Sequence, residues 1–216
     1  MNHGIAVLAG TPVDTQMGLD CLARAGIPGG MAFPLAQDPR EQTAFQISPP
    51  EEKQRRCREL LRRAGERGCG RALVYCNSLA AAVDFPPLAA ELGLRIVTPL
   101  DVYSRLANRY RRLGILAANG QGLAGIERTL LLANPALDLL GACSLPTVLA
   151  VESGEDPAAL VERNRLPALA AWFAACGMEA LLLGCTHFPY YKDALAVRTS
   201  LPLIDPAEEM LSLLLA

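Results

Sequence analysis

The sequence is poor in the residues that metal sites and several cofactors need. Its 216 residues include only two histidines, His3 and His187, and only two lysines, Lys53 and Lys192. No two cysteines are spaced as CxxC. A zinc site with ordinary ligand spacing is therefore not expected, and a Schiff-base cofactor such as pyridoxal phosphate has few anchors. We predict neither a metal nor a cofactor.

The sequence also lacks a strong net charge and a long apolar run. Twenty basic and 22 acidic residues give a net charge of −2, so no basic field predicts binding to nucleic acid or to an anionic membrane. The run Ile5–Ala9 is too short for a signal peptide, and Met210–Ala216 is far below the roughly 20 residues that span a bilayer. Seven cysteines without disulfide-scaffold spacing predict reduced thiols and a cytoplasmic location.

Short apolar segments alternate with helical patterns along the chain, which predicts an α/β fold with parallel sheets covered by helices. We expect strands at residues 4–10, 30–35, 71–75, 95–98, 113–118, 138–143, 179–184 and 201–204. We expect helices at residues 15–25, 50–67, 79–92, 122–133 and 158–175, and one more at the C-terminus.

Two parts of the chain resemble each other, which predicts an internal repeat. Cys69–Ser78 and Cys176–His187 each run from Cys-Gly through an apolar strand to a second cysteine followed by polar residues. We therefore expect two similar α/β halves with the active site in the cleft between them. The expected halves are residues 1–98 plus 200–216, and residues 99–199.

Cys76 and Cys185 each follow the carboxyl end of an expected parallel strand, which is the edge where open α/β sheets bind ligands. The polar residues after each cysteine can open a helix, whose unpaired N–H groups attract anions and favour a thiolate. A thiolate on one face of a stereocentre and a thiol on the other can invert it by proton transfer. The alternative is that both are buried core cysteines.

Four segments resemble the aspartate/glutamate racemase superfamily, and glutamate racemases in particular. Leu183–Pro189 is similar to their second cysteine motif over seven consecutive residues, and Tyr75–Ser78 is similar to the first. Ser48–Glu52 resembles the segment that opens the helix before the first cysteine, and Leu203–Glu209 resembles the closing strand and helix. The segments occur in the family's order and span most of the chain.

The resemblance implies two Rossmann-like halves and a cofactor-independent amino-acid racemase, often a homodimer. It implies that Cys76 and Cys185 are the acid/base residues and that His187 assists Cys185. It further implies that the substrate is glutamate or aspartate. The residues implied to hold its carboxylate or amino group are Asn77, Ser78 and Thr186.

The chain departs from glutamate racemases where substrate specificity is expected to be set. In place of an Asp-Ser pair after the first strand it has Gly10–Thr15, in which Thr11, Asp14 and Thr15 are candidates for the same groups. Asp14 can equally serve as a helix cap. Gln46 replaces part of an aromatic-glycine step, and Asn119 replaces a threonine-rich turn. A non-acidic amino acid or a hydantoin-type substrate therefore stays open.

A competing pattern points to a different enzyme class. Gly120–Gly125 fits GxGxxG between an expected strand and an expected helix, and Asp138 follows at about the distance of a ribose-binding acid. A dinucleotide-binding oxidoreductase is thus one alternative. A non-catalytic dicarboxylate-binding protein on the same fold is another, although the presence of both cysteines favours an enzyme.

Overall fold

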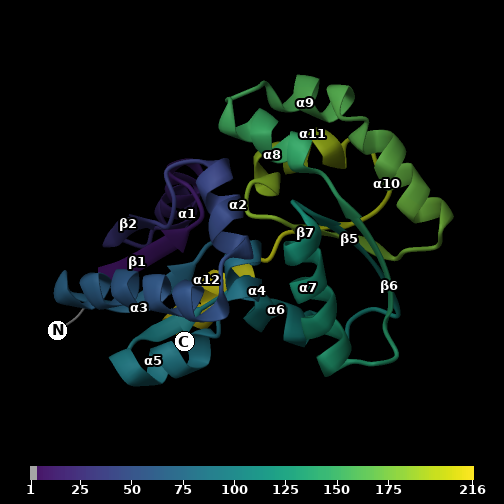
Figure 1. Ribbon diagram of the computed structural model, residues 1–216. Helices are drawn as coiled ribbons and strands as arrows, with labels where there is room; N and C mark the ends of the chain where they lie inside the picture. The colour runs from purple at the N-terminus through teal and green to yellow at the C-terminus, as the bar shows by residue number, and fades with distance from the viewer. Residues whose placement is uncertain (1–3) are drawn as a thin grey trace. The chain divides into compact units, whose positions relative to one another are not determined.

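The computed structural model describes residues 4–216, so His3 lies outside the described residues. The chain forms two compact units: one runs to Val102 and includes Ala207–Ala216, and the other is Tyr103–Pro206. Each unit contains a four-stranded parallel sheet with helices packed on it (Figure 1).

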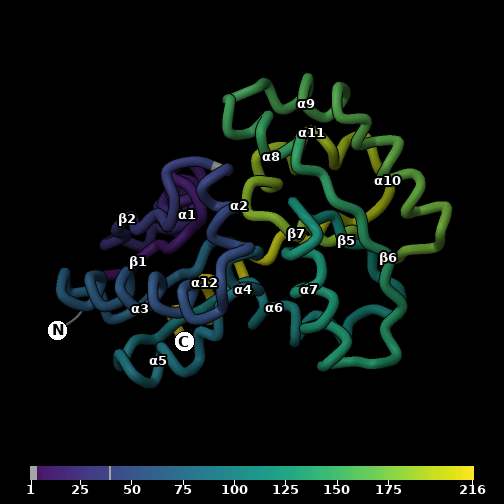
Figure 2. Tube along the Cα trace, in the orientation of Figure 1, coloured from purple at the N-terminus to yellow at the C-terminus, as the bar shows by residue number. Residues whose placement is uncertain are grey.

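The first unit is built on a sheet with the strand order β2-β1-β3-β4. Its elements are β1 (Gly4–Ala9), α1 (Pro12–Arg24), β2 (Gly30–Pro34), α2 (Pro39–Ile47), α3 (Pro50–Glu66), β3 (Cys69–Val74), α4 (Asn77–Ala82), α5 (Phe85–Leu92), β4 (Arg95–Val97) and α12 (Ala207–Leu215). Strand β1 is apolar and almost wholly buried, as a parallel strand covered on both faces should be. Helix α1 packs on β1 and β2, α3 on β3, and α12 on β3 and β4. The yellow end of the trace shows α12 among the elements of this unit (Figure 2).

The second unit is built on a sheet with the strand order β6-β5-β7-β8. Its elements are β5 (Arg112–Ala117), α7 (Gly120–Ala133), β6 (Asp138–Cys143), α8 (Leu145–Glu152), α9 (Pro157–Arg163), α10 (Leu166–Ala175), β7 (Ala180–Gly184), the 3-10 helix η1 (Phe188–Tyr191), α11 (Lys192–Ala196) and β8 (Leu203–Ile204). Strands β5 and β7 form the buried centre of the sheet. Helix α6 (Pro99–Leu106) begins in the first unit and ends in the second.

The two sheets share one topology. In each, the first strand of the unit lies between the second and the third, and the fourth borders the third. Cys76 follows β3 and Cys185 follows β7, so the two cysteines occupy equivalent positions after the third strand of their units. The predicted α/β fold with two similar parallel-sheet halves is confirmed.

The boundaries of the two units differ from the expected ones. Residues 200–216 were expected in the first half, but β8 pairs with β7 through Leu181 and Leu203 and so completes the second sheet. Only Ala207–Ala216 joins the first unit, and the first crossing lies after Val102 rather than after residue 98.

Two expected helices are each divided into two shorter helices, and a proline lies in the first turn of the second one. The helix expected at 79–92 is α4 followed by α5, and Pro86 lies in the first turn of α5, where the missing N–H costs nothing. The helix expected at 158–175 is α9 followed by α10. There Arg165 has φ 54° and Pro167 lies in the first turn of α10. Helices α2, α6, α8, α11 and η1 were not predicted.

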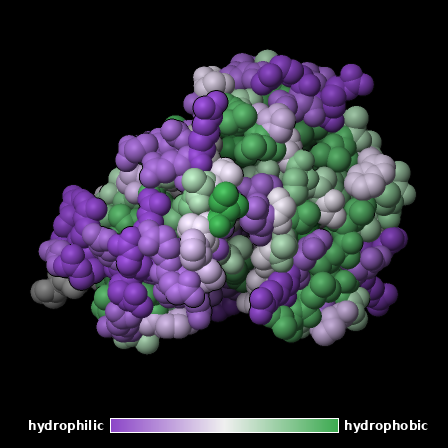
Figure 3. All heavy atoms as spheres, in the orientation of Figure 1, coloured by the Kyte–Doolittle hydropathy of each residue, from purple (hydrophilic) through white to green (hydrophobic). Residues whose placement is uncertain are grey.

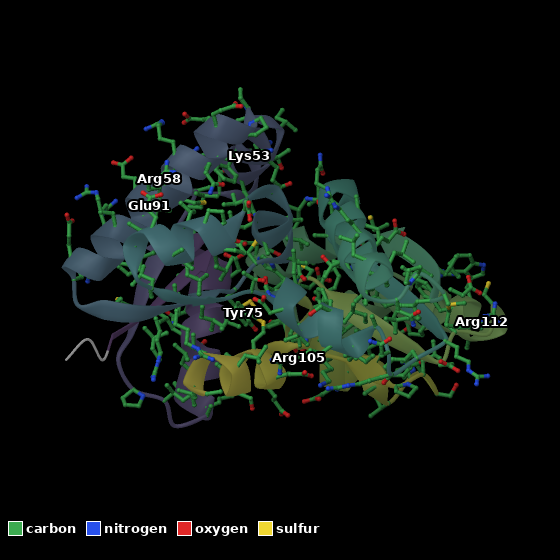
Figure 4. All side chains as sticks on the ribbon, turned by 90° about the horizontal axis from the view of Figure 1, so that it is seen from below. Lys53, Arg58, Tyr75, Glu91, Arg105 and Arg112 are labelled. Carbon is green, nitrogen blue, oxygen red and sulfur yellow. The ribbon has the colours of Figure 1, made fainter. Side chains whose placement is uncertain are left out.

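Helix α3 carries its charge on the solvent side. Arg55 pairs with Glu52, and Arg58 pairs with Glu91 of α5, where Figure 4 shows the two side chains next to each other. The space-filling view shows hydrophilic residues over α3 (Figure 3). Each exposed pair contributes at most about 1 kcal/mol, so burial of Cys57 and Leu61 on the opposite face does more to hold the helix. Between residues 4 and 216, no helix has the length and apolar character needed to cross a membrane.

Candidate functional site

The first candidate cysteine lies where β3 ends and α4 begins. Cys76 is the N-cap residue of α4 and is only 4% exposed. Its Sγ lies 3.5 Å from Ser78 Oγ and 3.4 Å from Gln42 Nε2 of α2. Gln46, one turn after Gln42, donates from Nε2 to Ser78 Oγ at 2.6 Å. The thiol therefore lies in a cluster of amide and hydroxyl groups.

The structure places three of the predicted residues at this end of β3. Ser78 and Gln46 contact each other beside Cys76, and Asn77 is buried as the first residue of α4. Gln42 was not predicted, because α2 was not expected. Its signals are present in the sequence: Asp38-Pro39 is a helix start, and Gln42 and Gln46 are spaced to lie on one helix face.

Thr11, Asp14 and Thr15 begin α1 directly after β1. Thr11 is the N-cap residue, and its backbone N–H donates to Asp14 Oδ1 at 2.6 Å in a capping box. The N–H of Gly10 donates to the other Asp14 oxygen at 3.1 Å, and Thr15 Oγ1 donates to the Thr11 carbonyl. All three side chains are buried. These contacts give the group a structural part in starting α1, and a part in catalysis or substrate binding stays a prediction.

The second candidate cysteine lies where β7 ends. Cys185 is 6% exposed, and its Sγ lies 3.6 Å from Nδ1 of His187. Nε2 of His187 lies 2.7 Å from Oε1 of Glu152, the last residue of α8. The side chains of His187 and Glu152 are 4% and 14% exposed, so water screens this pair weakly. Cys185, His187 and Glu152 form a hydrogen-bonded chain.

This chain of groups can move a proton. With its Nε2 proton directed at the Glu152 carboxylate, His187 presents Nδ1 to the sulfur of Cys185. A neutral imidazole accepts the thiol proton there, and the carboxylate stabilises the imidazolium that forms. Glu152 was not predicted, since α8 was not expected and the residue lies far from His187 in the sequence. Pro146 after Ser144 is the helix-start signal that would have indicated α8.

Two further buried hydroxyl side chains belong to the surroundings of Cys185. Burial raises the pKa of Tyr191 well above its usual value, and the nearby Cys185 charge acts in the same direction, while the Thr147 hydroxyl opposes them. The phenol therefore stays protonated. Thr186, between Cys185 and His187, is also buried, and its part in binding the substrate stays a prediction.

The GxGxxG segment does not form a dinucleotide site in the second unit. Gly120–Gly125 lies within α7, and Asn119 caps that helix by accepting a hydrogen bond from Gly122 N at 3.0 Å. Asp138 starts β6 opposite Arg112, the first residue of β5, and it pairs with that arginine. Asp138 is thus at the amino end of the sheet, whereas α7 begins after its carboxyl end. A ribose-binding acid must lie at the same edge as the glycines, so this alternative is not supported.

Among residues 4–216, no group of three His, Cys, Asp or Glu side chains is placed to hold a metal ion. Cys57 of α3 is a buried thiol that does not lie next to either candidate cysteine. Desolvation raises its pKa to about 12, and the charge of Arg56 opposes this shift. Cys57 is therefore a core residue and not a nucleophile.

No protein-family model matches the sequence. A glutamate racemase from Thermus thermophilus is 33% identical over 141 residues, which are 63% of this chain and 50% of that protein. The chain thus spans about half the length of the curated relatives it matches.

Solved structures show the same fold at low sequence identity. A glutamate racemase from Francisella tularensis, in complex with D-glutamate, has a TM-score of 0.75 at 19% identity, over 99% of this chain and 81% of that one. An aspartate racemase homologue from Pyrococcus horikoshii has a TM-score of 0.72 at 15% identity, over 100% of this chain and 98% of that one. Both have the fold described above.

Proposed function

We propose that this chain is a cofactor-independent amino-acid racemase of the aspartate/glutamate racemase superfamily. The similarity in sequence to glutamate racemases and the shared fold support this proposal. One observation carries the proposal. Two buried cysteines follow equivalent strands of a repeated sheet, and each has its own set of hydrogen-bonding groups. A repeated fold with a thiol at the same point of each repeat suits a reaction that needs one base and one acid.

The proposed reaction is a proton transfer through both thiols. One thiolate removes the α-proton of the amino acid, and the other thiol donates a proton to the opposite face of the same carbon. The two cysteines exchange roles when the reaction runs in reverse. In this proposal Gln42 and Ser78 support the thiolate form of Cys76, while His187 and Glu152 support that of Cys185.

The proposed substrate is an acidic amino acid, glutamate or aspartate. Its carboxylate would accept hydrogen bonds from backbone and side-chain donors at Asn77, Ser78 and Thr186, which lie directly after the two thiols. The D-glutamate complex of the Francisella protein and the aspartate racemase homologue support this class of substrate. Donors aimed at the carboxylate also stabilise the negative charge that develops when the α-proton leaves.

We also propose that the protein is located in the cytoplasm. All seven cysteines are free thiols, which supports a reducing compartment such as the cytoplasm. A homodimer stays a prediction from the family resemblance. The alternative of a non-catalytic dicarboxylate-binding protein is distinguished by turnover.

The test uses four single variants. Cys76→Ser and Cys185→Ser should each lower racemisation by at least about 100-fold, because a hydroxyl is a far weaker base than a thiolate. Cys143→Ser and Cys176→Ser are matched controls, since Cys143 is exposed at the end of β6 and Cys176 is half-buried at the end of α10. Circular dichroism checks that all four fold. Unchanged turnover in either of the first two variants would sink the two-thiol mechanism.

A further inference from the structure

Two glutamines of α2 and one serine of α4 surround the sulfur of Cys76. Gln42 Nε2 lies 3.4 Å from Cys76 Sγ and 3.4 Å from Ser78 Oγ. Gln46 Nε2 lies 2.6 Å from the same Ser78 oxygen. Since Gln42 and Gln46 are four residues apart on one helix, they present their amides to the same place.

The direction of each hydrogen bond follows from the chemistry of the groups. An amide nitrogen only donates, so both glutamines donate to Ser78 Oγ and occupy its two lone pairs. The hydroxyl proton of Ser78 is then left to point at its remaining neighbour, Cys76 Sγ at 3.5 Å. The sulfur thus receives one N–H directly from Gln42 and one O–H from Ser78. Both donors favour a thiolate over a thiol.

The backbone makes room for this arrangement. A Cβ on Gly10 would lie 2.0 Å from Gln42 Nε2, so the Gln42 amide occupies the space where any other residue at position 10 would have its side chain. At Gln46 the backbone carbonyl accepts a hydrogen bond from Lys53 Nζ at 3.2 Å, and the residue is only 6% exposed. The Gln42 amide thus fills the space beside Gly10, and the Gln46 side chain meets Ser78 in a buried place.

We propose that Gln42 is a positioning residue that holds Cys76 in the thiolate form, and that Gln46 acts with it by turning the Ser78 hydroxyl toward the sulfur. This inference rests on the proposed function for its meaning in catalysis. It gives the two thiols different supports: neutral amides and a hydroxyl for Cys76, and an imidazole with a carboxylate for Cys185. Among charged groups, Asp14 is bonded to Gly10 N, and Gly10 is the residue beside the Gln42 amide.

The test measures the acidity of the Cys76 thiol without requiring turnover. The reduced 216-residue chain is alkylated with iodoacetamide over a range of pH, and the rate at each cysteine is read by peptide mass spectrometry. The pH of half-maximal rate reports how readily Cys76 ionises, and the plateau at high pH reports how accessible it is. Exposed Cys143 reports the reagent, and buried Cys57 reports global opening.

Two substitutions of similar size separate the donor from its packing. Gln42→Met removes the N–H groups, and the pH of half-maximal alkylation of Cys76 should rise by about one unit. Alkylation at a pH below that midpoint should then be ~10-fold slower. Gln42→Glu puts a carboxylate beside the sulfur and should raise it further. Gln16→Met is the matched control, since Gln16 is exposed on α1 and bonds to Asp20. It should leave the midpoint unchanged.

The outcomes separate this inference from the proposed function. If Gln42→Met and Gln42→Glu both keep the wild-type midpoint at normal plateau rates, the role of Gln42 is refuted whether or not the protein racemises amino acids. If the midpoint rises as expected in a protein that turns over no amino acid, the inference about Gln42 holds and the proposed function fails.

Discussion

The hydrogen bond between His187 and Glu152 offers the sharpest test of how Cys185 is supported. Glu152→Gln keeps the shape of the side chain and removes its charge at 2.7 Å from His187 Nε2. For two unit charges about 4 Å apart with a dielectric constant of about 20, the interaction is about 4 kcal/mol. The glutamine oxygen still accepts a hydrogen bond and offsets part of this. We expect a net loss of about 1.4–2.7 kcal/mol of imidazolium stabilisation, which lowers the midpoint of His187 titration by about 1–2 pH units.

The scarcity of histidine makes the measurement direct. Untagged protein has only two imidazole signals, and His3→Gln identifies the one that belongs to His187. The pH titration of that signal is compared between wild type, Glu152→Gln and Glu155→Gln. The last is the control, because Glu155 pairs with Arg163 instead of His187. An equal His187 midpoint in wild type and Glu152→Gln would refute the assignment of Glu152.

Three further predictions concern turnover, stability and packing. Because a racemase has an equilibrium constant of one, Glu152→Gln must change kcat/KM by the same factor for the L- and the D-enantiomer. Steady-state assays that start from each enantiomer check this, and unequal changes would exclude racemisation. The thiol of Cys57 keeps its proton in the folded chain until about pH 12 but ionises near its ordinary pKa of 9.0 when unfolded, so unfolding gets easier as pH rises across this range. The free energy of unfolding measured in urea should fall by up to about 4 kcal/mol from pH 9 to 12, and it should fall less in Cys57→Ala. An equal fall in both proteins would contradict this role of Cys57. Gly10→Ala adds a methyl group that displaces only the flexible end of Gln42, so it should lower the free energy of unfolding by less than about 1 kcal/mol. It should still raise the pH midpoint of Cys76 alkylation, as Gln42→Met does. An unchanged midpoint would show that the amide lies elsewhere.

The sequence was sufficient for the fold because parallel strands carry a strong local signal. β1, β5 and β7 are short apolar runs that end at small or polar residues, and the similarity of the two halves shows in the segments that lead to Cys76 and Cys185. The ends of helices were harder to place. Proline at a first helical turn looks in the sequence like an interruption, and at α5 and α10 it is the start of a new helix.

The candidate site could be predicted only where it lies next to a strand end. Ser78, Thr186 and His187 follow the cysteines directly, so the sequence places them beside the thiols. Gln42 and Glu152 lie on helices that were not expected and reach the sulfur or the imidazole across long sequence separations. The predicted boundary at residue 200 was wrong for a similar reason. The strand that pairs with the two-residue strand β8 is set by tertiary contacts and not by the sequence of β8 itself.

The most direct test of the central claim is the position of deuterium after partial reaction in D₂O. Separate samples of L- and D-glutamate and of L- and D-aspartate are incubated with reduced protein, and NMR with a chiral assay follows the label in each enantiomer. Two thiols acting on opposite faces predict that deuterium enters the product enantiomer first, while the remaining starting enantiomer keeps its proton. Equally fast labelling of the starting enantiomer would indicate a single base, and no exchange in any sample of folded protein would contradict the proposed acidic amino-acid racemase.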